Sequence, residues 1–288
     1  MVLQLLRLVR PQQYVKNGFL FMPLFFSLRI DDIHLLWRTL VAFVLFSAIA
    51  SSVYILNDIS DINEDKAHPI KKHRPLASGA VSKRLAMSIM FVLLVFGEVA
   101  AFLLDHVFFF ILSGYFLINL AYSLILKHVS ILDITIIAAG FVLRIYAGAI
   151  IVDVPVSMWI VLMTFLLALF LALAKRRDDV LLAADGRQIR KNIDGYNLEF
   201  VSASMVIMAA VVLVSYILYT VSPDVQARFH SHYLYATAFF VVLGILRYLQ
   251  LALVYNNTAN PTDIVLRDRF LQAAIGCWLA SFALIAYT

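Results

Sequence analysis

Nine apolar stretches recur along the chain, and shorter polar segments separate them. Most of the stretches hold about 20 residues, the length that a helix needs to cross the hydrocarbon core of a bilayer. A helix also satisfies its own backbone hydrogen bonds without water. The pattern therefore predicts an all-α, polytopic membrane protein with nine transmembrane helices, near residues 18–30, 38–56, 85–104, 107–126, 130–151, 155–174, 200–221, 233–254 and 270–287.

The composition supports this fold class and excludes others. Of the 288 residues, 63% are hydrophobic, which is more than a soluble domain of this size needs. The single cysteine, Cys277, lies inside an apolar stretch, so a disulfide framework and a cysteine metal site are excluded. No small-residue cleavage site follows a short apolar core at the N-terminus, so we expect no removable signal peptide.

The basic residues are distributed unevenly between the two ends of the predicted helices. On the side that holds the N-terminus lie 18 of the 23 Lys and Arg residues, against three on the other side. Loops rich in Lys and Arg stay in the cytoplasm, so we expect a cytoplasmic N-terminus and a C-terminus outside. The polar segments 57–84, 175–199 and 255–269 then belong to the cytoplasmic side of a single transmembrane catalytic domain. The net charge of +5 reports topology, and no nucleic-acid partner is expected.

Acidic side chains gather directly after the second apolar stretch. On a helix, at about 100° per residue, one face of roughly 120° presents Asn57, Asp58, Asp61, Glu64 and Asp65. Carboxylates that lie so close repel each other unless a cation neutralises them. Mg²⁺ prefers oxygen ligands and shares its shell with substrate phosphates. This face therefore predicts a Mg²⁺ site for a substrate with a pyrophosphate group; the alternative is a solvated acidic helix end.

Basic side chains follow the acidic face and recur in the segment 175–200. Lys71 and Arg74 stand just after the acids, and Arg190, Lys191 and Tyr196 stand in the later segment. Arginine forks and lysine ammonium groups suit phosphate oxygens, so both segments are candidates for binding anionic groups. The alternative is that they hold ordinary positive charges at cytoplasmic helix ends.

Polar residues also occur within and next to the apolar stretches. Tyr122 ends the fourth stretch, Lys127 follows it, and Arg144 lies inside the fifth. An arginine at membrane depth costs at least a few kcal/mol unless it finds a partner, so Arg144 is expected to pair with a carboxylate or a bound anion. Tyr122 has the alternative of simple helix packing. Small residues such as Gly148 indicate close helix packing in the same stretch.

The acidic motif resembles that of a known family. Asn57-Asp58-x-x-Asp61-x-x-x-Asp65, directly after a predicted membrane helix, is similar to the first aspartate-rich motif of the UbiA superfamily of intramembrane prenyltransferases. The resemblance covers nearly the whole chain, and it implies a UbiA-like bundle that binds Mg²⁺ and a diphosphate at this motif.

The usual second aspartate-rich motif of that family is absent after the sixth stretch. Asp178, Asp179 and Asp185 do not have the spacing D-x-x-Y-A-x-x-D-x-x-D, and basic residues follow them. A closer resemblance is to the branch of decaprenyl-phosphate phosphoribosyltransferase. Five stretches carry it in order: Arg10-Pro11-x-Gln13-x-x-Lys16-Asn17; His68-Pro69-x-Lys71-x-x-Arg74-Pro75; Tyr122-Ser123 with Lys127; Gly140-Phe141 with Arg144; and the run from Asn260-Pro261 to Arg269.

This resemblance implies a reaction and a set of roles. The reaction is Mg²⁺-dependent transfer of 5-phosphoribosyl from phosphoribosyl pyrophosphate to a polyprenyl (decaprenyl) phosphate, with release of pyrophosphate, for a cell-envelope glycolipid precursor. The implied Mg²⁺ ligands are Asp58, Asp61 and Asp65. The implied catalytic residues are Asp58, Asp61, Lys16 and Lys127. The implied substrate-binding residues are Asn57, Lys71, Arg74, Tyr122, Arg144, Arg190, Lys191 and Tyr196.

Two other functions stay open. The first is a prenyltransferase that moves a polyprenyl group from its diphosphate to an aromatic acceptor. The second is a transporter or lipid-binding membrane protein without catalysis. That function predicts charges at mid-membrane depth and not at the cytoplasmic end of the helical bundle. The resemblance places the chain in a bacterial plasma membrane, and the oligomeric state is left open, with a homo-oligomer among the alternatives.

Overall fold

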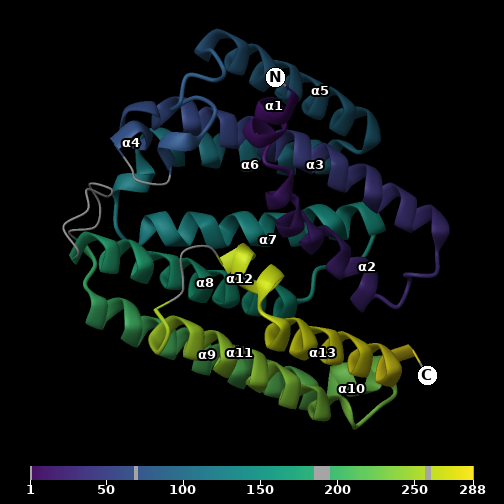
Figure 1. Cartoon of the computed structure of the whole chain (residues 1–288). Coiled ribbons are helices and arrows are strands. Elements are labelled where there is room, and N and C mark those ends of the chain that lie inside the picture. The colour runs from purple at the N-terminus through teal and green to yellow at the C-terminus, as the bar shows by residue number, and fades with distance from the viewer. Residues whose placement is uncertain (1, 68–70, 185–194, 257–260, 288) are drawn as a thin grey trace. The chain divides into compact units, whose positions relative to one another are not determined.

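The computed structural model describes residues 2–67, 71–184, 195–256 and 261–287 (Figure 1). Helices make up most of these residues, and no strand occurs among the residues described. The predicted all-α fold is therefore confirmed. The described residues form two compact units, the first ending at Val156 and the second beginning at Ser157.

The first unit contains seven α-helices and three short or irregular 3₁₀ helices in its described part. In chain order they are α1 (Val2–Val9), η1 (Pro11–Phe21), α2 (Met22–Phe26), α3 (Ile33–Ser60), α4 (Ile62–Ala67), η2 (Lys71–His73), α5 (Lys83–Leu104), α6 (His106–Leu124), η3 (Leu126–His128) and α7 (Leu132–Val152).

The second unit is also helical in its described part. Its described elements are α8 (Met158–Ala184), α9 (Leu198–Val221), α10 (Pro223–Phe229), η5 (Leu234–Thr237), α11 (Ala238–Leu253), α12 (Pro261–Arg267) and α13 (Arg269–Tyr287).

Eight helices in the described residues are long and apolar enough to cross a membrane. They match the second to ninth predicted stretches, so the multi-pass fold is confirmed while the count of nine is not. The first predicted stretch, 18–30, instead forms the end of η1 and the five-residue α2. Pro23 lies at the start of α2 and has no backbone N–H to donate. A 3₁₀ helix rises more steeply than an α-helix, so η1 and α2 together still extend about 30 Å.

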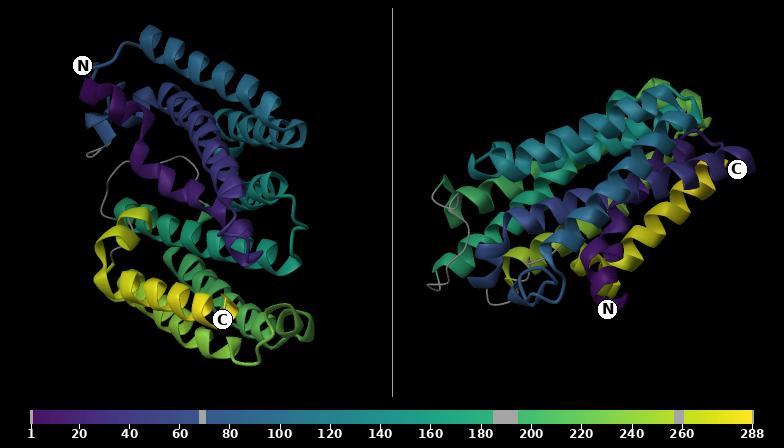
Figure 2. Two further views of the ribbon diagram at one scale, coloured as in Figure 1. Left: turned by 90° about the vertical axis from the view of Figure 1, so that its right-hand side faces the viewer. Right: turned by 90° about the horizontal axis from the view of Figure 1, so that it is seen from above.

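Helix α3 lies at the centre of the first unit. It runs beside α5 and α6 in both views of Figure 2. Phe46 and Ile49 on α3 are fully buried in a core that also takes Leu112 from α6 and Ile151 from α7. A helix that is apolar all round is a buried helix, and α3 fits that rule from Leu45 to Val53, where every residue is buried. It therefore forms a fixed support for the polar residues at its end.

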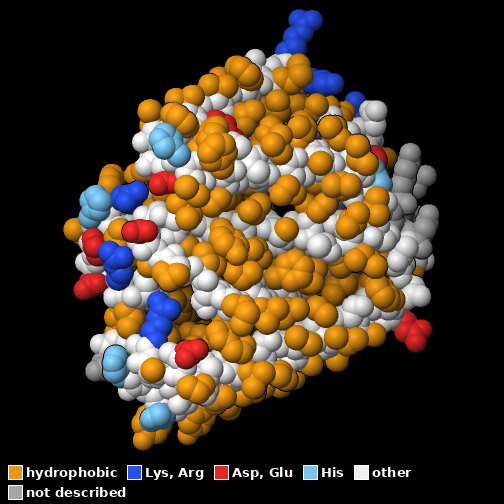
Figure 3. Space-filling view, turned by 180° about the vertical axis from the view of Figure 1, so that it is seen from behind, with side chains coloured by type: hydrophobic (Ala, Val, Ile, Leu, Met, Phe, Trp, Pro, Cys, Tyr) orange, Lys and Arg blue, Asp and Glu red, His pale blue; other side chains and the backbone are white. Residues whose placement is uncertain are grey.

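The outer helices present apolar side chains outward. On α5 the exposed residues include Phe91, Val95 and Phe102. Hydrophobic side chains cover most of the face in Figure 3. A soluble protein rarely exposes so much contiguous apolar surface, so this surface is suited to lipid.

In the second unit, α8 packs on α9 and α11 packs on α13. Asp268 joins α11 to α13. Its carboxylate caps the N-terminus of α13 by accepting from Leu271 N (2.9 Å), and it also accepts from Nη2 of Arg247 on α11 (2.8 Å). The hydrogen bonds from Arg247 lower the pKa of Asp268 below its usual value. Arg247, which lies within an apolar stretch, thus has a carboxylate partner at the helix end.

Candidate active site

The acidic motif lies on a nearly continuous helical path at the end of α3. Asp61 ends α3, and its N–H donates to the carbonyl of Asn57 (2.9 Å). The N–H of Asp65, in α4, donates in turn to the carbonyl of Asp61 (2.8 Å). The helical interpretation of 57–65 is confirmed. It also explains the pairing below, since Asp58 and Asp65 lie about 20° apart around such a helix, and Asn57 and Asp61 about 40° apart.

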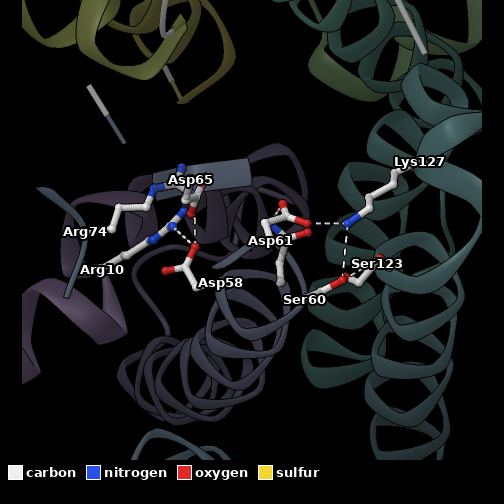
Figure 4. Close-up of polar contacts among 9 residues, drawn as sticks. Arg10, Asp58, Ser60, Asp61, Asp65, Arg74, Ser123 and Lys127 are labelled. Carbon is white, nitrogen blue, oxygen red and sulfur yellow. Dashed lines mark hydrogen bonds and ion pairs between the residues drawn. The ribbon is translucent and has the colours of Figure 1, made fainter. Parts of the chain in front are cut away.

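The acidic residues Asp58, Asp61 and Asp65 and their cationic partners form a cluster with two halves, which we call the aspartate cluster. Asp58 and Asp65 form one half, together with two arginines. Nη1 of Arg74 lies 3.0 Å from Oδ1 of Asp58 and 2.7 Å from Oδ2 of Asp65. Arg10 pairs with the same Oδ1 of Asp58 (Figure 4). One carboxylate oxygen therefore receives hydrogen bonds from two guanidinium groups.

Asp61 and Lys127 form the other half, to the right of Asp58 and Asp65 in Figure 4. The Lys127 ammonium pairs with Oδ1 of Asp61 and donates to Oγ of Ser60 (3.3 Å). Asn57 donates from Nδ2 to Oδ2 of Asp61 (3.1 Å). Ser60 donates to the carbonyl of Ser123 (3.2 Å), which joins the end of α3 to the end of α6.

The three aspartates are buried, with exposed fractions of 1% for Asp58, 5% for Asp61 and 3% for Asp65. A buried carboxylate is costly unless it is paired and hydrogen-bonded, and here each has a cationic partner. Glu64, the fourth acid of the predicted face, is exposed and lies outside this cluster. Three buried acids thus face Arg10, Arg74 and Lys127.

No group of three His, Cys, Asp or Glu side chains is arranged to hold a metal ion in the described part of the chain. The donor chemistry nevertheless fits Mg²⁺, because Asp58 and Asp65 place carboxylate oxygens on one guanidinium group, and Asp61 follows on the same helical path with the Asn57 amide beside it. A metal ion would exchange with the present arginine and lysine partners. The Mg²⁺ assignment stays a prediction.

Arg10 belongs to the cluster but was not among the predicted site residues. It precedes Pro11 and adopts the left-handed conformation, with φ 55° and ψ 60°. That conformation is strained for a residue other than glycine and persists where the surroundings determine it. Its guanidinium also lies 5.5 Å from the ring centre of Tyr54. The Arg10-Pro11 pattern was the only signal in the sequence, and it did not reveal the partner 48 residues away.

Other predicted site residues lie on nearby elements of the first unit. Lys16 is half-buried on η1, Lys71 is half-buried at the start of η2, and Tyr122 is half-buried beside Ser123 on α6. The catalytic role of Lys16 and the substrate-binding roles of Lys71 and Tyr122 stay predictions. Arg190 and Lys191 lie outside the described residues, and Tyr196 is buried in the second unit against Phe200.

Arg144 is buried (4% exposed) without a carboxylate partner among the described residues. Its three nitrogens donate to Oδ1 of Asn17 (2.8 Å), the carbonyl of Gly140 (2.7 Å) and the hydroxyl of Tyr115 (3.1 Å). Aromatic rings surround the guanidinium, with centres at 4.9 Å (Phe46), 5.0 Å (Tyr115) and 5.3 Å (Phe141). The expected ion pair with a carboxylate is therefore replaced by neutral acceptors and ring faces.

The end of α8, where the family's second acidic motif is expected, instead carries arginines that pair within the second unit. Asp179 pairs with Arg176 on the same helix, α8. Arg177 donates to the carbonyl of Ala252 (2.6 Å) and to Oδ1 of Asn256 (2.8 Å). Both arginines are buried, so these contacts hold the end of α8 within the second unit.

Comparison with known proteins identifies the fold and the family. The model of the UbiA prenyltransferase family matches residues 20–271. The chain belongs to the UbiA prenyltransferase family. It is 32% identical to decaprenyl-phosphate phosphoribosyltransferase of Mycolicibacterium smegmatis, over 98% of this chain and 92% of that protein. The enzyme of the same name from Mycobacterium tuberculosis strain H37Rv is 30% identical, over 98% of this chain and 93% of that protein.

Solved structures support the same membrane fold. A UbiA homologue from Archaeoglobus fulgidus bound to DMAPP and Mg²⁺ superimposes with a TM-score of 0.70, covering 98% of this chain and 99% of that one, at 18% identity. At that identity the likeness concerns the fold. The chain is thus a multi-pass, UbiA-family transferase, and the resemblance stated from its motifs is confirmed.

Proposed function

We propose that this UbiA-family enzyme transfers 5-phosphoribosyl from phosphoribosyl pyrophosphate to a polyprenyl phosphate and releases pyrophosphate. One observation carries the proposal: the named relatives that match nearly the full chain are decaprenyl-phosphate phosphoribosyltransferases. The paired acids and bases at the end of α3 support it, since both substrates and both products carry phosphate groups.

The bond changes need little proton transfer. An anionic oxygen of the polyprenyl phosphate attacks C1 of the ribose, and the bond from C1 to the pyrophosphate oxygen breaks with its electron pair. The acceptor oxygen is already ionised, so no strong general base is required. The transition state is expected to resemble an oxocarbenium ion, as in other glycosyl transfers. The protein's task is to position two anionic substrates and to stabilise the leaving group.

The cluster provides groups for both tasks. Asp58, Asp61 and Asp65, with Asn57, would hold Mg²⁺, which when bound supplies positive charge to the leaving pyrophosphate. Arg10, Arg74 and Lys127 now lie on these carboxylates. We expect them to turn to phosphate oxygens when the donor binds. The remaining predicted contacts come from Lys16, Lys71, Tyr122, Arg190, Lys191 and Tyr196, whereas Arg144 is buried and donates to acceptors within the protein.

The acceptor determines where the reaction takes place. A polyprenyl chain must stay in lipid, and the apolar outer helices are compatible with a lateral approach from the bilayer. We propose a bacterial plasma membrane, with the N-terminus and active site in the cytoplasm, where charged donors are available. The product would serve as a precursor of a cell-envelope glycolipid.

The second candidate is transfer of a prenyl group to an aromatic acceptor. The family name and the prenyl diphosphates named with its solved relatives favour it. The absence of the second acidic motif from the sequence of α8 and the segment after it argues against it, because that motif usually accompanies the prenyl-diphosphate reaction.

A transfer assay separates the two candidates. Membranes that contain the protein would receive labelled phosphoribosyl pyrophosphate, a polyprenyl phosphate and Mg²⁺, with EDTA in a parallel sample. The proposal predicts label in the lipid phase in the Mg²⁺ sample only. Transfer from a prenyl diphosphate to an aromatic acid, with no lipid labelling from the ribosyl donor, would overturn it.

A further inference from the structure

Polar contacts connect the N-terminal segment, from Val9 to Asn17, with one face of α3. The contributing side chains on α3 are spaced by four, three and four residues: Ser47, Ser51, Tyr54 and Asp58. Such spacing repeats on the same side of a helix. We call this set of contacts the polar ladder. It runs in the opposite direction along the two segments and ends at the aspartate cluster.

Each step of the polar ladder is a defined contact. Asn17 donates from Nδ2 to Oγ of Ser47 (2.9 Å), and the hydroxyls of Tyr14 and Ser51 lie 2.9 Å apart. Ser51 also donates to the carbonyl of Val9 (2.9 Å). The last step is Arg10, which lies over the Tyr54 ring and pairs with Asp58.

Arg144 holds the other end of the polar ladder. Its Nε donates to Oδ1 of Asn17, whose Nδ2 is committed to Ser47. Asn17 is only 1% exposed, so both of its polar atoms need partners inside the protein. Removing either partner would leave a buried amide group unsatisfied. Arg144 on α7 and Ser47 on α3 therefore fix Asn17 between them.

The neighbourhood of this junction leaves the segment little freedom. A Cβ atom built on Gly148 of α7 would lie 2.1 Å from the carbonyl oxygen of Leu20, so α7 and η1 are in direct backbone contact. The 3₁₀ helix η1 has 11 residues, whereas such helices rarely exceed four. Side-chain contacts must therefore stabilise it.

From this geometry we infer that Arg144 is a positioning residue. Through Asn17 and Ser47 it sets the place of η1 along α3, and so the place of Arg10 and Lys16 relative to the aspartate cluster. The consequence for catalysis rests on the proposed function; the consequence for the segment does not. Direct binding of a phosphate by Arg144 is the competing role.

The position of the segment can be measured without substrate. In a Cys277→Ser background, exposed Gln12 and Ala80 would be replaced by cysteine and spin-labelled, and the distance distribution recorded in lipid nanodiscs. Arg144→Lys keeps the charge but cannot make all three contacts, and Ser47→Ala keeps Arg144 itself. We expect both variants to broaden or shift the distribution.

Ser52→Ala is the matched control. Ser52 is adjacent to Ser51 and equally buried, but its hydroxyl donates to the carbonyl of Ile49 on the same helix (2.7 Å). We expect the parent distribution in this variant. An unchanged distribution in Ser47→Ala and Arg144→Lys would overturn the inference. If Arg144→Lys does not fold, Ser47→Ala decides the question alone.

A kinetic cycle then tests whether Arg144 acts through the segment. We expect Arg144→Lys to lower kcat/KM for the donor by about tenfold when Lys16 is present, but by less than about threefold in a Lys16→Gln background. Equal losses in both backgrounds would favour direct substrate binding and overturn the positioning role. If the unmodified enzyme fails to use the ribosyl donor, the proposed function fails, while the spin-label result still decides the place of the segment.

Discussion

Asp58 and Asp65 share the guanidinium of Arg74, whereas Asp61 pairs with Lys127. These contacts neutralise three buried acids. They also hold three cations where a pyrophosphate is proposed to bind. The same pairs thus stabilise the cluster, and their charges are the ones that the proposed transfer reaction would use.

The structure, and not the sequence, shows that Arg10 belongs to the aspartate cluster, where it pairs with Asp58. Replacing Arg10 by glutamine removes a charge-assisted contact to the cluster. We expect Arg10→Gln to raise KM for phosphoribosyl pyrophosphate by about tenfold, because a hydrogen bond to a charged group contributes on the order of 1.5–3 kcal/mol. The control is Arg84→Gln, which removes an exposed charge at the start of α5. Equal KM values in the two variants would contradict the role of Arg10.

The sequence predicted which side chains lie together only when they belong to one helix. The spacing of Asp58, Asp61 and Asp65 predicted their common helical face, because the distance along one helix fixes the angle between side chains. The partners Arg10 and Lys127 come from other elements, and no local pattern reports which elements meet. For the same reason the sequence predicted that Arg144 needs a partner but not that Asn17, Gly140 and Tyr115 would accept its hydrogen bonds.

For whole helices, the apolar stretches predicted where each membrane helix lies in the sequence, but they predicted less well where each helix ends. Helix α3 continues to Ser60 and α8 to Ala184, four and ten residues beyond the predicted apolar stretches. Charged residues end an apolar stretch, yet they do not end a helix once it has left the hydrocarbon. The stretch 18–30 failed for a different reason: Pro23 and the 3₁₀ geometry of η1 interrupt what length alone would make a single helix.

Gly148 tests the contact between η1 and α7. An alanine methyl group there would meet the backbone of Leu20, which cannot move away as a side chain could. We expect Gly148→Ala to lower the free energy of unfolding by about 1–3 kcal/mol, measured as a lower melting temperature in detergent. Gly114→Ala is the control, because no atom lies within 4 Å of its Cβ position on α6. A Gly148→Ala protein as stable as this control would contradict the close packing.

Asp268 gives the junction of α11 and α13 a dependence on pH. Since Arg247 lowers the pKa of Asp268, the ion pair stabilises the fold fully above the carboxyl group's ordinary pKa. The contribution is lost as pH falls through the lowered value. Asparagine keeps the helix cap without the charge. We therefore expect the difference in melting temperature between the parent and Asp268→Asn to be largest near neutral pH and to shrink below about pH 4.

Asp105→Asn serves as the comparison for that titration. Asp105 caps α6 at Phe108 N (2.8 Å), and no cationic partner is recorded for it among the described residues. A difference for Asp268→Asn that stays constant down to acid pH would contradict the contribution of the ion pair.

At the scale of the whole molecule, the fold class followed from apolar length and the family from the motif order. The 18 to 3 bias of basic residues adds an orientation that the family match does not supply. This orientation determines which side of the membrane supplies the donor. It can be tested independently of catalysis.

Cysteine labelling in intact cells tests the orientation. In a Cys277→Ser background, exposed Gln12 and Ala227 would each be replaced by cysteine in separate proteins. Ala227 lies between two predicted spans on the side with few basic residues. We expect an impermeant maleimide to label Ala227→Cys in intact spheroplasts and Gln12→Cys after permeabilisation only. The reverse order would contradict a cytoplasmic N-terminus.

The proposed transfer of phosphoribosyl to a polyprenyl phosphate is tested most directly by a stoichiometry measured on purified enzyme. Label from phosphoribosyl pyrophosphate that enters the polyprenyl phosphate would be counted against pyrophosphate released, for the parent, Asp61→Asn and Glu64→Gln. We expect one pyrophosphate per labelled lipid in the parent and a loss of at least about a hundredfold in Asp61→Asn. Glu64→Gln should keep a rate near that of the parent, because the Glu64 side chain is exposed. Full transfer by Asp61→Asn, or no transfer by the parent, would contradict the proposal.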